Sequence, residues 1–327
     1  MKYRDNYKNQ TILITGGSGC IGSNLTKALI PYAKKIIVLD DLSAAREWNV
    51  PVSPNVQFIK GSILDESVLK RVFSEDIDYV FHLAAHFANQ NSVDHPELDL
   101  MVNGMGIVNV LQYSVIRKVK RFVYSSSGCS VYGSQAPLPL KEDYVSLHLD
   151  TPYQITKLLG ELYCNYFMNQ YGLKVGIARY FNVFGPGEIP GQYRNVIPNF
   201  IWKAMNKEPL VITGTGEETR DFTYVDDIVD GTLRIGCFEF AIGQAFNLAS
   251  EKETTVNEIA EIVNRITGNK TGVIYAKRRD WDQIIKRRAS IQKAHEVLGY
   301  TPKTNVEKGI KNVYEWINTN YVKIRNT

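Results

Sequence analysis

Short apolar runs alternate with stretches of helical periodicity through the first half of the chain. The apolar runs are TILITGG, KIIVLD, VQFIKGS, YVFHLAAH, RFVYSSS and VGIARYFNVFG. Runs that are apolar at almost every position are typical of strands covered on both faces, whereas a strand with one solvated face alternates strictly. The pattern therefore predicts an α/β fold with a doubly wound parallel sheet and right-handed crossovers.

The pattern loosens after residue 184. The segment GPGEIPGQYRN, residues 185–195, is rich in Gly, Pro and polar residues and is typical of a long functional loop. Shorter strand-like units follow it, namely LVIT, AFNLA and VIYAK. We predict a first domain of residues 1–184 with a returning segment at about 223–248. Residues 185–222 and 249–327 would form a smaller, mixed α/β domain.

Composition narrows the classes of function. The formal net charge of +4 is small for 327 residues, which argues against a dedicated nucleic-acid binder. The four cysteines are scattered without a CxxC pair, a usage typical of reduced thiols in the cytoplasm. The start, MKYRDNYKNQ, is polar, and no apolar run is long enough to span a bilayer. We expect a cytoplasmic protein with no nucleic-acid or membrane partner.

Three glycines lie between the first predicted strand and the helix after it. Gly16, Gly19 and Gly22 have the spacing that gives, in turn, a tight turn, a close approach of the backbone to a pyrophosphate, and close packing of helix on sheet. The phosphates would lie at the helix N-terminus, where free N–H groups and the helix dipole favour anions. Such glycines also occur in turns that bind nothing, but their place after the first strand favours a Rossmann-type dinucleotide site.

An acidic residue follows at the expected distance. Asp40 ends the second predicted strand, 18 residues after Gly22. A carboxylate at this point can accept hydrogen bonds from the adenosine ribose, and it would repel a 2′-phosphate. The sequence therefore predicts NAD rather than NADP. The neighbouring Asp41 is an alternative for the same role.

A candidate catalytic set follows a central strand. The run YSSSGCSVYG ends this strand, and the next helix carries Tyr153 and Lys157 four residues apart, on one face. An ammonium group and an oxidised nicotinamide would lower the pKa of the phenol. Tyr153 could then take a proton from a substrate hydroxyl while a hydride leaves the same carbon. Tyr-x-x-x-Lys also occurs by chance on exposed helices, but its combination with the glycines and serines favours a redox site.

The chain resembles the extended short-chain dehydrogenase/reductase family, in the nucleotide-sugar epimerase and dehydratase branch that includes UDP-glucose 4-epimerase. The resemblance rests on motifs in the family's order, namely TGGSGCIGSNL, HLAA, SSSGCSVYG, PYQITK, RYFNVFGPG, RDFTYVDD and RRDWD. It implies NAD that stays bound and a nucleoside-diphosphate hexose that is oxidised transiently at C4. It also implies a catalytic set of Ser127, Tyr153 and Lys157.

The serine run departs from the pattern of many relatives. Ser127 lies five residues before Tyr132, where four is common, and Gly128 is the apparent extra residue. The run is similar to a variant form found in some epimerases. Ser126 and Ser130 remain alternatives to Ser127.

The resemblance implies two sets of binding residues. At the cofactor it places Ser62 and Ile63 by the adenine and Phe181 near the nicotinamide, within the set Gly16, Gly19, Cys20, Ile21, Gly22, Asp40, Asp41, Ser62, Ile63, Leu83, Ala84, Ala85, Tyr153, Lys157 and Phe181. Around the diphosphate and ribose of the substrate it places Asn182, Arg220, Arg279 and Asp282. Arginine forks suit a diphosphate, and a carboxylate suits a ribose diol.

Two further polar features are less specific. The basic run KRR, residues 286–288, is ordinarily a solvated charged face. A position near Lys286 or Arg287 corresponds to one that sets tolerance for the C2 substituent in the family, and a cation there could alternatively bind a uronic carboxylate. His82 and His86 are too few for a metal site, and we expect no metal.

The favoured function is 4-epimerisation of a nucleoside-diphosphate hexose, with a UDP-sugar preferred. A 4,6-dehydratase, a UDP-glucuronate decarboxylase and a non-catalytic NAD-binding regulator are the alternatives. A regulator would not need the set Ser127, Tyr153 and Lys157. Dehydratase and decarboxylase relatives carry acidic residues just after or close to the catalytic Ser/Thr, whereas residues 128–130 are Gly-Cys-Ser. A carboxylate from another loop, such as Glu188 or Asp143, could still act at C5.

A homodimer is expected. The predicted helices at about 104–116 and 153–170 carry more apolar positions than one sheet face needs. In relatives, these helices pair into a four-helix bundle.

Overall fold

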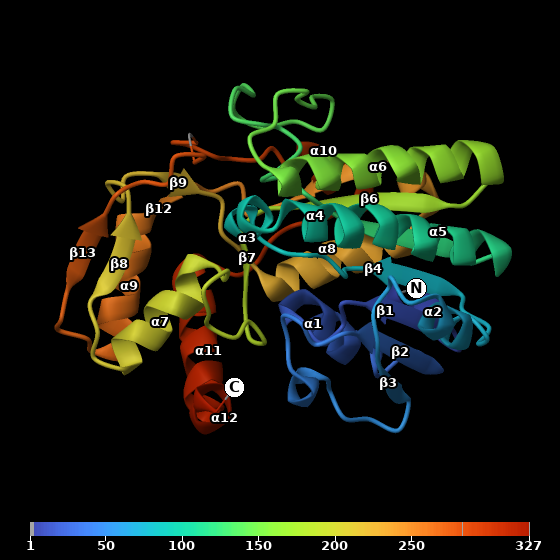
Figure 1. The fold of residues 1–327 in the computed structure, drawn as a ribbon, viewed down its shortest axis with the longest axis horizontal. Coiled ribbons are helices and arrows are strands. Elements are labelled where there is room, and N and C mark those ends of the chain that lie inside the picture. Colours follow the sequence, from blue (N-terminus) through green and yellow to red (C-terminus); the bar gives the residue numbers. More distant parts are fainter. Residues whose placement is uncertain (1–2, 283, 327) are drawn as a thin grey trace.

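The computed structural model describes residues 3–282 and 284–326. Its centre is a seven-stranded sheet in the order β11-β6-β5-β4-β1-β2-β3, with every neighbouring pair parallel (Figure 1). The strands are β1 (Thr11–Thr15), β2 (Lys35–Asp40), β3 (Val56–Lys60), β4 (Tyr79–His82), β5 (Arg121–Ser127), β6 (Val175–Tyr180) and β11 (Ala245–Leu248). Because β1 pairs with both β2 and β4, the strand order reverses there, which is where such sheets bind ligands.

Helices cover both faces of the sheet, and this explains the continuous apolar runs. Ile12 and Ile14 belong to a core shared with α1 (Cys20–Leu29) and α8 (Val225–Cys237). Leu13 points to the opposite core, which α5 (Gly106–Ile116), α6 (Pro152–Tyr171) and α2 (Glu66–Val72) complete. The predicted doubly wound α/β fold is confirmed.

The start of α6 is well defined by its sequence. The Thr151 hydroxyl accepts a hydrogen bond from the backbone N–H of Gln154 at 3.4 Å, and Pro152 occupies the first turn, as is common at helix N-termini. The helix ends at Gly172, which has a φ of 70°. Before α5 the chain forms α3 (Asn89–Asp94), α4 (Pro96–Asp99) and a π-helical segment, Leu100–Met105.

A second lobe forms at the left of Figure 1, around the parallel pair β8 (Leu210–Thr213) and β13 (Val273–Ala276). Short pairs join β7 with β10 and β9 with β12. The remaining elements are β7 (Val183–Phe184), β9 (Thr219–Arg220), β10 (Thr223–Tyr224), β12 (Thr254–Thr255), α7 (Val196–Met205), α9 (Val256–Thr267), α10 (Gln292–Leu298), α11 (Val306–Thr319), α12 (Tyr321–Arg325) and the 3₁₀ turns Tyr3–Tyr7, Glu47–Asn49 and Glu239–Ala241.

The chain returns to the sheet after entering the second lobe. Helix α8 packs on one sheet face, and β11 pairs with β6 at the edge. We therefore propose the same division as above, with residues 1–184 and about 223–248 in the sheet domain. Within the described part of the chain, no helix combines the length and apolar character needed to cross a bilayer.

Candidate active site

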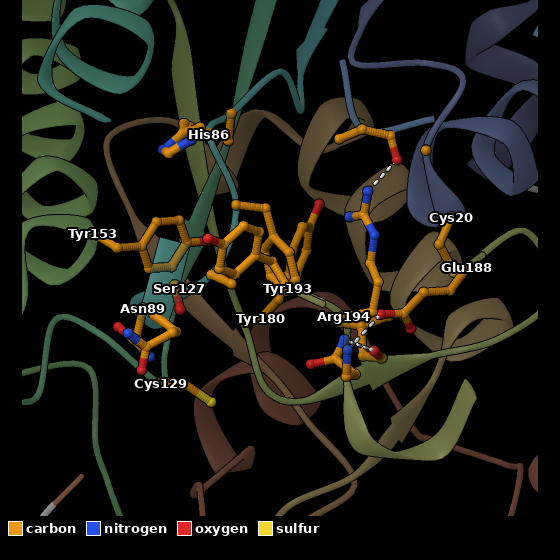
Figure 2. A pocket seen from close by; sticks show the side chains of 18 of the residues that line it. Cys20, His86, Asn89, Ser127, Cys129, Tyr153, Tyr180, Glu188, Tyr193 and Arg194 are labelled. Atoms are coloured by element: carbon orange, nitrogen blue, oxygen red, sulfur yellow. Dashed lines mark hydrogen bonds between the residues drawn. The ribbon is translucent and has the colours of Figure 1, made fainter. Parts of the chain in front are cut away.

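A cavity of about 560 Å³ is lined by residues at the carboxyl ends of the central strands and by residues of the second lobe (Figure 2). Most residues singled out from the sequence line it together. They are Gly16, Gly19, Cys20, Ile21, Gly22, Asp40, Asp41, Ser62, Ile63, Leu83, Ala84, Ala85, Ser127, Tyr153, Lys157, Asn182, Arg220, Arg279 and Asp282.

Phe181, unlike the other predicted cofactor residues, does not line the cavity. Its side chain is fully buried and stacks near the Tyr132 ring. A Cβ built on Gly128 would lie 2.0 Å from the Phe181 ring, so this ring supports the loop after β5 from behind. The Phe181 side chain is therefore part of the core, and the position of this residue near a nicotinamide stays a prediction.

The glycine loop has the shape of a phosphate cradle. Gly16 has a φ of +69°, and a Cβ there would lie 2.6 Å from the backbone nitrogen of Ala84. A Cβ on Gly22 would lie 2.5 Å from the Gly16 carbonyl oxygen, so this glycine lets α1 pack against the loop. Gly19 precedes α1 and no side chain caps the helix. The first backbone N–H groups of α1 thus border the cavity, and they fit the pyrophosphate of a dinucleotide.

The two candidate ribose carboxylates differ in environment. Asp40 is buried and accepts hydrogen bonds from the backbone N–H groups of Ser18 at 3.0 Å and Leu42 at 2.9 Å. Burial raises the pKa of Asp40 above its ordinary value. Asp41 is exposed and accepts from the backbone N–H of Ser43 at 2.9 Å. Asp40 therefore ties β2 to the glycine loop, and both carboxylates stay at the cavity wall.

Tyr153 and Lys157 lie on one face of α6, as their spacing predicts. The Lys157 ammonium donates to the carbonyl oxygen of Ser125 at 2.9 Å, and it lies 5.6 Å from the centre of the Tyr153 ring. Burial lowers the pKa of Lys157 to about 8. Burial also raises the pKa of Tyr153, so in the protein itself this side chain is a phenol at neutral pH. The predicted lowering of the pKa of Tyr153 requires the oxidised nicotinamide together with the ammonium, and it stays a prediction.

The three candidate serines have different partners. Ser127 lines the cavity on the same side as Tyr153, and it accepts a hydrogen bond from the Ser130 hydroxyl at 2.9 Å (Figure 2). Ser126 instead donates to Glu161 at 2.5 Å, within a buried network. Ser127 thus remains the best candidate for a substrate contact, and Ser130 orients it.

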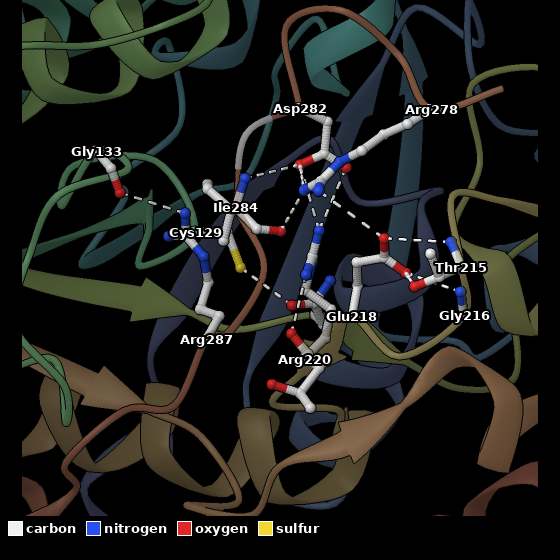
Figure 3. A network of polar contacts seen from close by, with 12 residues as sticks. Cys129, Gly133, Thr215, Gly216, Glu218, Arg220, Arg278, Asp282, Ile284 and Arg287 are labelled. Carbon is white, nitrogen blue, oxygen red and sulfur yellow. Dashed lines mark hydrogen bonds and ion pairs between the residues drawn. The ribbon is translucent and has the colours of Figure 1, made fainter.

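Two of the candidate substrate residues, Arg220 and Asp282, lie side by side in a polar network (Figure 3). The Arg220 guanidinium donates to Asp282 at 3.3 Å, and Arg279 lies 5.9 Å from the centre of the Trp281 ring. The Asn182 side-chain oxygen accepts from the Cys129 thiol at 3.2 Å. The arrangement offers arginines for a diphosphate and a carboxylate for a ribose.

The carboxylates suspected at C5 lie elsewhere. Glu188 is buried, and it accepts from the backbone N–H of Asn195 at 3.1 Å. Figure 2 shows it beside Cys20 and Arg194, on the opposite side of the cavity from Ser127. Burial raises the pKa of Glu188 to about 7. Asp143 is exposed and is not part of the cavity wall.

Arg194 also lines the cavity and was not predicted from the sequence. Its guanidinium donates to the carbonyl oxygen of Ala44, so it bridges the long loop to the region after β2 (Figure 2). It lies near Cys20 and Asp40 at the cofactor end. Its place in a loop already expected to be functional was the available signal.

Neither histidine is placed for metal binding. His82 is buried with its Nδ1 atom 2.9 Å from the Thr15 hydroxyl, and burial lowers its pKa to about 3. His86 faces Asp99, with 3.7 Å between Nδ1 and Oδ2. In residues 3–282 and 284–326, no group of three or more His, Cys, Asp or Glu side chains is arranged to hold a metal ion.

Residues 12–249 match the family model described as the NAD dependent epimerase/dehydratase family. The chain belongs to this family. The match confirms the family resemblance drawn from the motifs, and with it NAD as the cofactor.

Individual relatives agree with this assignment. A putative UDP-glucose 4-epimerase of Methanocaldococcus jannaschii is 33% identical over 94% of this chain and 99% of its own. A UDP-N-acetyl-α-D-glucosaminuronate decarboxylase of Bacillus cytotoxicus is 31% identical over 93% and 96%. The solved structure of the epimerase Mth375 of Methanothermobacter thermautotrophicus is 54% identical, covers 100% of this chain and 97% of its own, and superposes with a TM-score of 0.99.

Proposed function

We propose that the protein is an NAD-dependent 4-epimerase of a nucleoside-diphosphate hexose, with a UDP-sugar as substrate. The observation that carries the proposal is one cavity that holds the glycine loop, the set Ser127, Tyr153 and Lys157, and the Arg220–Asp282 pair. When bound at the glycine loop, NAD would supply a reversible hydride acceptor for C4 of the sugar.

The protein residues handle the proton and the position of the sugar. Tyr153 exchanges a proton with the C4 oxygen. Because the pKa of the neighbouring Lys157 is lowered to about 8, the charge of this side chain can change when the phenol gains or loses its proton. Ser127, oriented by Ser130, donates to the same oxygen. Arg220 and Arg279 hold the diphosphate while the hexose rotates in the cavity and presents its other face.

The distribution of carboxylates supports epimerisation over dehydration or decarboxylation. Among the described residues that line the cavity, the carboxylates are Asp40, Asp41, Glu188, Glu218 and Asp282. The first two lie at the glycine loop, Glu218 accepts from the backbone N–H of Gly216, and Asp282 pairs with Arg220. None of them hydrogen-bonds to Ser127, so none of these carboxylates takes the place of the acidic residues that dehydratase and decarboxylase relatives carry close to the catalytic Ser/Thr.

Product analysis tests this function. The purified protein should convert a UDP-hexose to its C4 epimer when incubated with a panel of UDP-, dTDP- and GDP-sugars, each with and without a C6 carboxylate, and followed by NMR. A stable 4-keto-6-deoxy sugar or a pentose product would contradict the proposal, and so would the absence of conversion in every member of the panel.

The proposal includes a homodimer built from α5 and α6. These helices expose the apolar side chains Ile116, Ile155, Leu162 and Tyr166. We expect light scattering to give the mass of a dimer at micromolar concentration, and Leu162→Glu to give a monomer. Val52→Glu, at an exposed apolar residue on neither helix, should remain a dimer. A wild-type monomer would contradict the expectation.

We also propose that the protein works in the cytoplasm. Its four cysteines, Cys20, Cys129, Cys164 and Cys237, are free thiols, and one of them lines the cavity next to Ser127 and another borders the glycine loop. Thiols of this kind persist in a reducing compartment.

A further inference from the structure

One arginine at the cavity lacks the partner that comparable arginines have. Among the described residues, Arg121, Arg179 and Arg287 are the buried arginines, with 3%, 3% and 2% of their surface exposed. Arg179 forms a bidentate pair with Glu161, and Arg121 pairs with Glu239 at 2.7 Å. Arg287 forms no ion pair with a described carboxylate, and of these buried arginines it is the one that lines the cavity.

Arg287 lies at the hexose end of the site. Its guanidinium donates to the carbonyl oxygens of Gly128 at 3.0 Å and Gly133 at 3.4 Å, both in the loop after β5. Gly128 directly follows Ser127, and Figure 3 shows Arg287 beside Cys129. The guanidinium therefore borders the place where C4 and its ring neighbours react.

The position of Arg287 is fixed by its backbone. Leu140 donates its N–H to the Arg288 carbonyl oxygen at 2.9 Å and accepts from the N–H of Ser290 at 2.8 Å. The N–H of Ala289 donates to Asp221 at 3.3 Å. This strand-like pairing holds the backbone on the C-terminal side of Arg287, so the guanidinium is held in place before any ligand binds.

The basic run of residues 286–288 is thus not one solvated face. Lys286 is exposed, and Arg288 is partly exposed with Glu253 at 3.9 Å. The side chain of Arg287, between them, points inward. Of Lys286 and Arg287, Arg287 is therefore the residue that lines the cavity.

The Arg287 guanidinium hydrogen-bonds to two neutral carbonyl groups, and the nearby carboxylates Asp282 and Asp150 act on its charge without forming an ion pair with it. Burying a charge is unfavourable unless an opposite charge compensates it, and a guanidinium fork matches a carboxylate in a bidentate geometry. A hexose with only hydroxyl groups would add no direct ion pair to this guanidinium. A carboxylate at C6 is an anionic substituent close to the reacting carbon, since C6 is bonded to C5 and C5 to C4.

We propose that the sugar is a hexuronic acid whose C6 carboxylate binds Arg287. This inference rests on the proposed epimerase function and names its substrate class. The diphosphate has its own arginines, Arg220 and Arg279, and Arg220 is already paired with Asp282. The carboxylate of the sugar supplies the direct ion pair that no described carboxylate forms with Arg287.

Matched pairs of sugar nucleotides test the inference. UDP-glucose and UDP-glucuronate differ at C6, as do UDP-N-acetylglucosamine and its uronate, while the two pairs differ at C2. We expect kcat/KM for each uronate to exceed that of its neutral partner by at least about tenfold. Arg287→Met should lower kcat/KM for the uronates by about 100-fold and change it much less for the neutral sugars. Lys286→Met removes an exposed positive charge nearby and should change neither.

Three results would overturn the inference. The first is a wild-type preference for the neutral sugars, or one that follows the C2 substituent. The second is an equal loss on neutral and uronic sugars in Arg287→Met or, if that variant does not fold, in Arg287→Lys. The third is a calorimetric result in which Arg287→Met weakens the binding of UDP by the same factor as the binding of UDP-glucuronate. Arg287 would then bind the diphosphate. If no sugar is converted, the proposed function fails, and calorimetry with each matched pair still decides this inference.

Discussion

Tyr153→Phe will lower kcat by about 10²–10⁴-fold and leave NAD and the sugar nucleotide bound. The substitution removes the oxygen that exchanges a proton with the C4 oxygen and keeps the ring. That ring packs edge-on against Phe87, with 6.1 Å between the ring centres, so the fold and the cavity wall should persist. Initial rates measure kcat, and mass spectrometry of the denatured protein measures the retained NAD.

The same helix provides a control for this variant. Tyr163 also lies on α6 but does not line the cavity. Tyr163→Phe removes the same atom from the same helix and should leave kcat unchanged. If Tyr153→Phe kept nearly full activity, another residue would be the proton carrier. If it lost NAD together with activity, its role would be in binding.

Glu161→Ala will lower the free energy of unfolding by about 3–5 kcal/mol, because it leaves the Arg179 charge buried without a partner. Glu161 accepts from Arg179 at 2.9 and 2.8 Å and from the Ser126 hydroxyl at 2.5 Å. Arg179 also donates to the Tyr132 hydroxyl at 3.0 Å. The network joins α6, β5 and β6 just behind the proposed catalytic residues. Denaturant unfolding followed by circular dichroism measures the loss.

An exposed ion pair sets the scale for that measurement. Arg265 and Glu307 pair at 2.7 Å with 62% and 52% of their side chains exposed. Glu307→Ala should lower the free energy of unfolding by less than about 1 kcal/mol, since solvent screens such pairs. Equal losses in the two variants would mean that burial does not strengthen the Glu161–Arg179 pair.

Features set by neighbouring residues were predictable from the sequence. The apolar runs give the sheet, because a strand with both faces covered needs apolar residues at successive positions. The glycines give the phosphate cradle, because Gly16 and Gly22 meet backbone atoms that leave no space for a side chain. The spacing of Tyr153 and Lys157 places both on one helix face.

Features set by distant parts of the chain were not predictable. Arg287 faces inward because Leu140 and Asp221, both far away in the sequence, bind the backbone of the residues after it. Phe181 turns into the core because Gly128 leaves room for its ring. Glu188 lies at the cofactor end because the long loop folds back over α1. The sequence alone does not determine which way these side chains point.

Turnover in deuterated water tests the central claim most directly. An epimerase returns its own hydride to C4, so we predict that the C4 epimer forms with no deuterium on any carbon. The reaction should be run with both a neutral UDP-hexose and its uronate, with NMR for the carbon positions and a measurement of released CO₂. Deuterium at C5, or CO₂ from the uronate, would contradict the account.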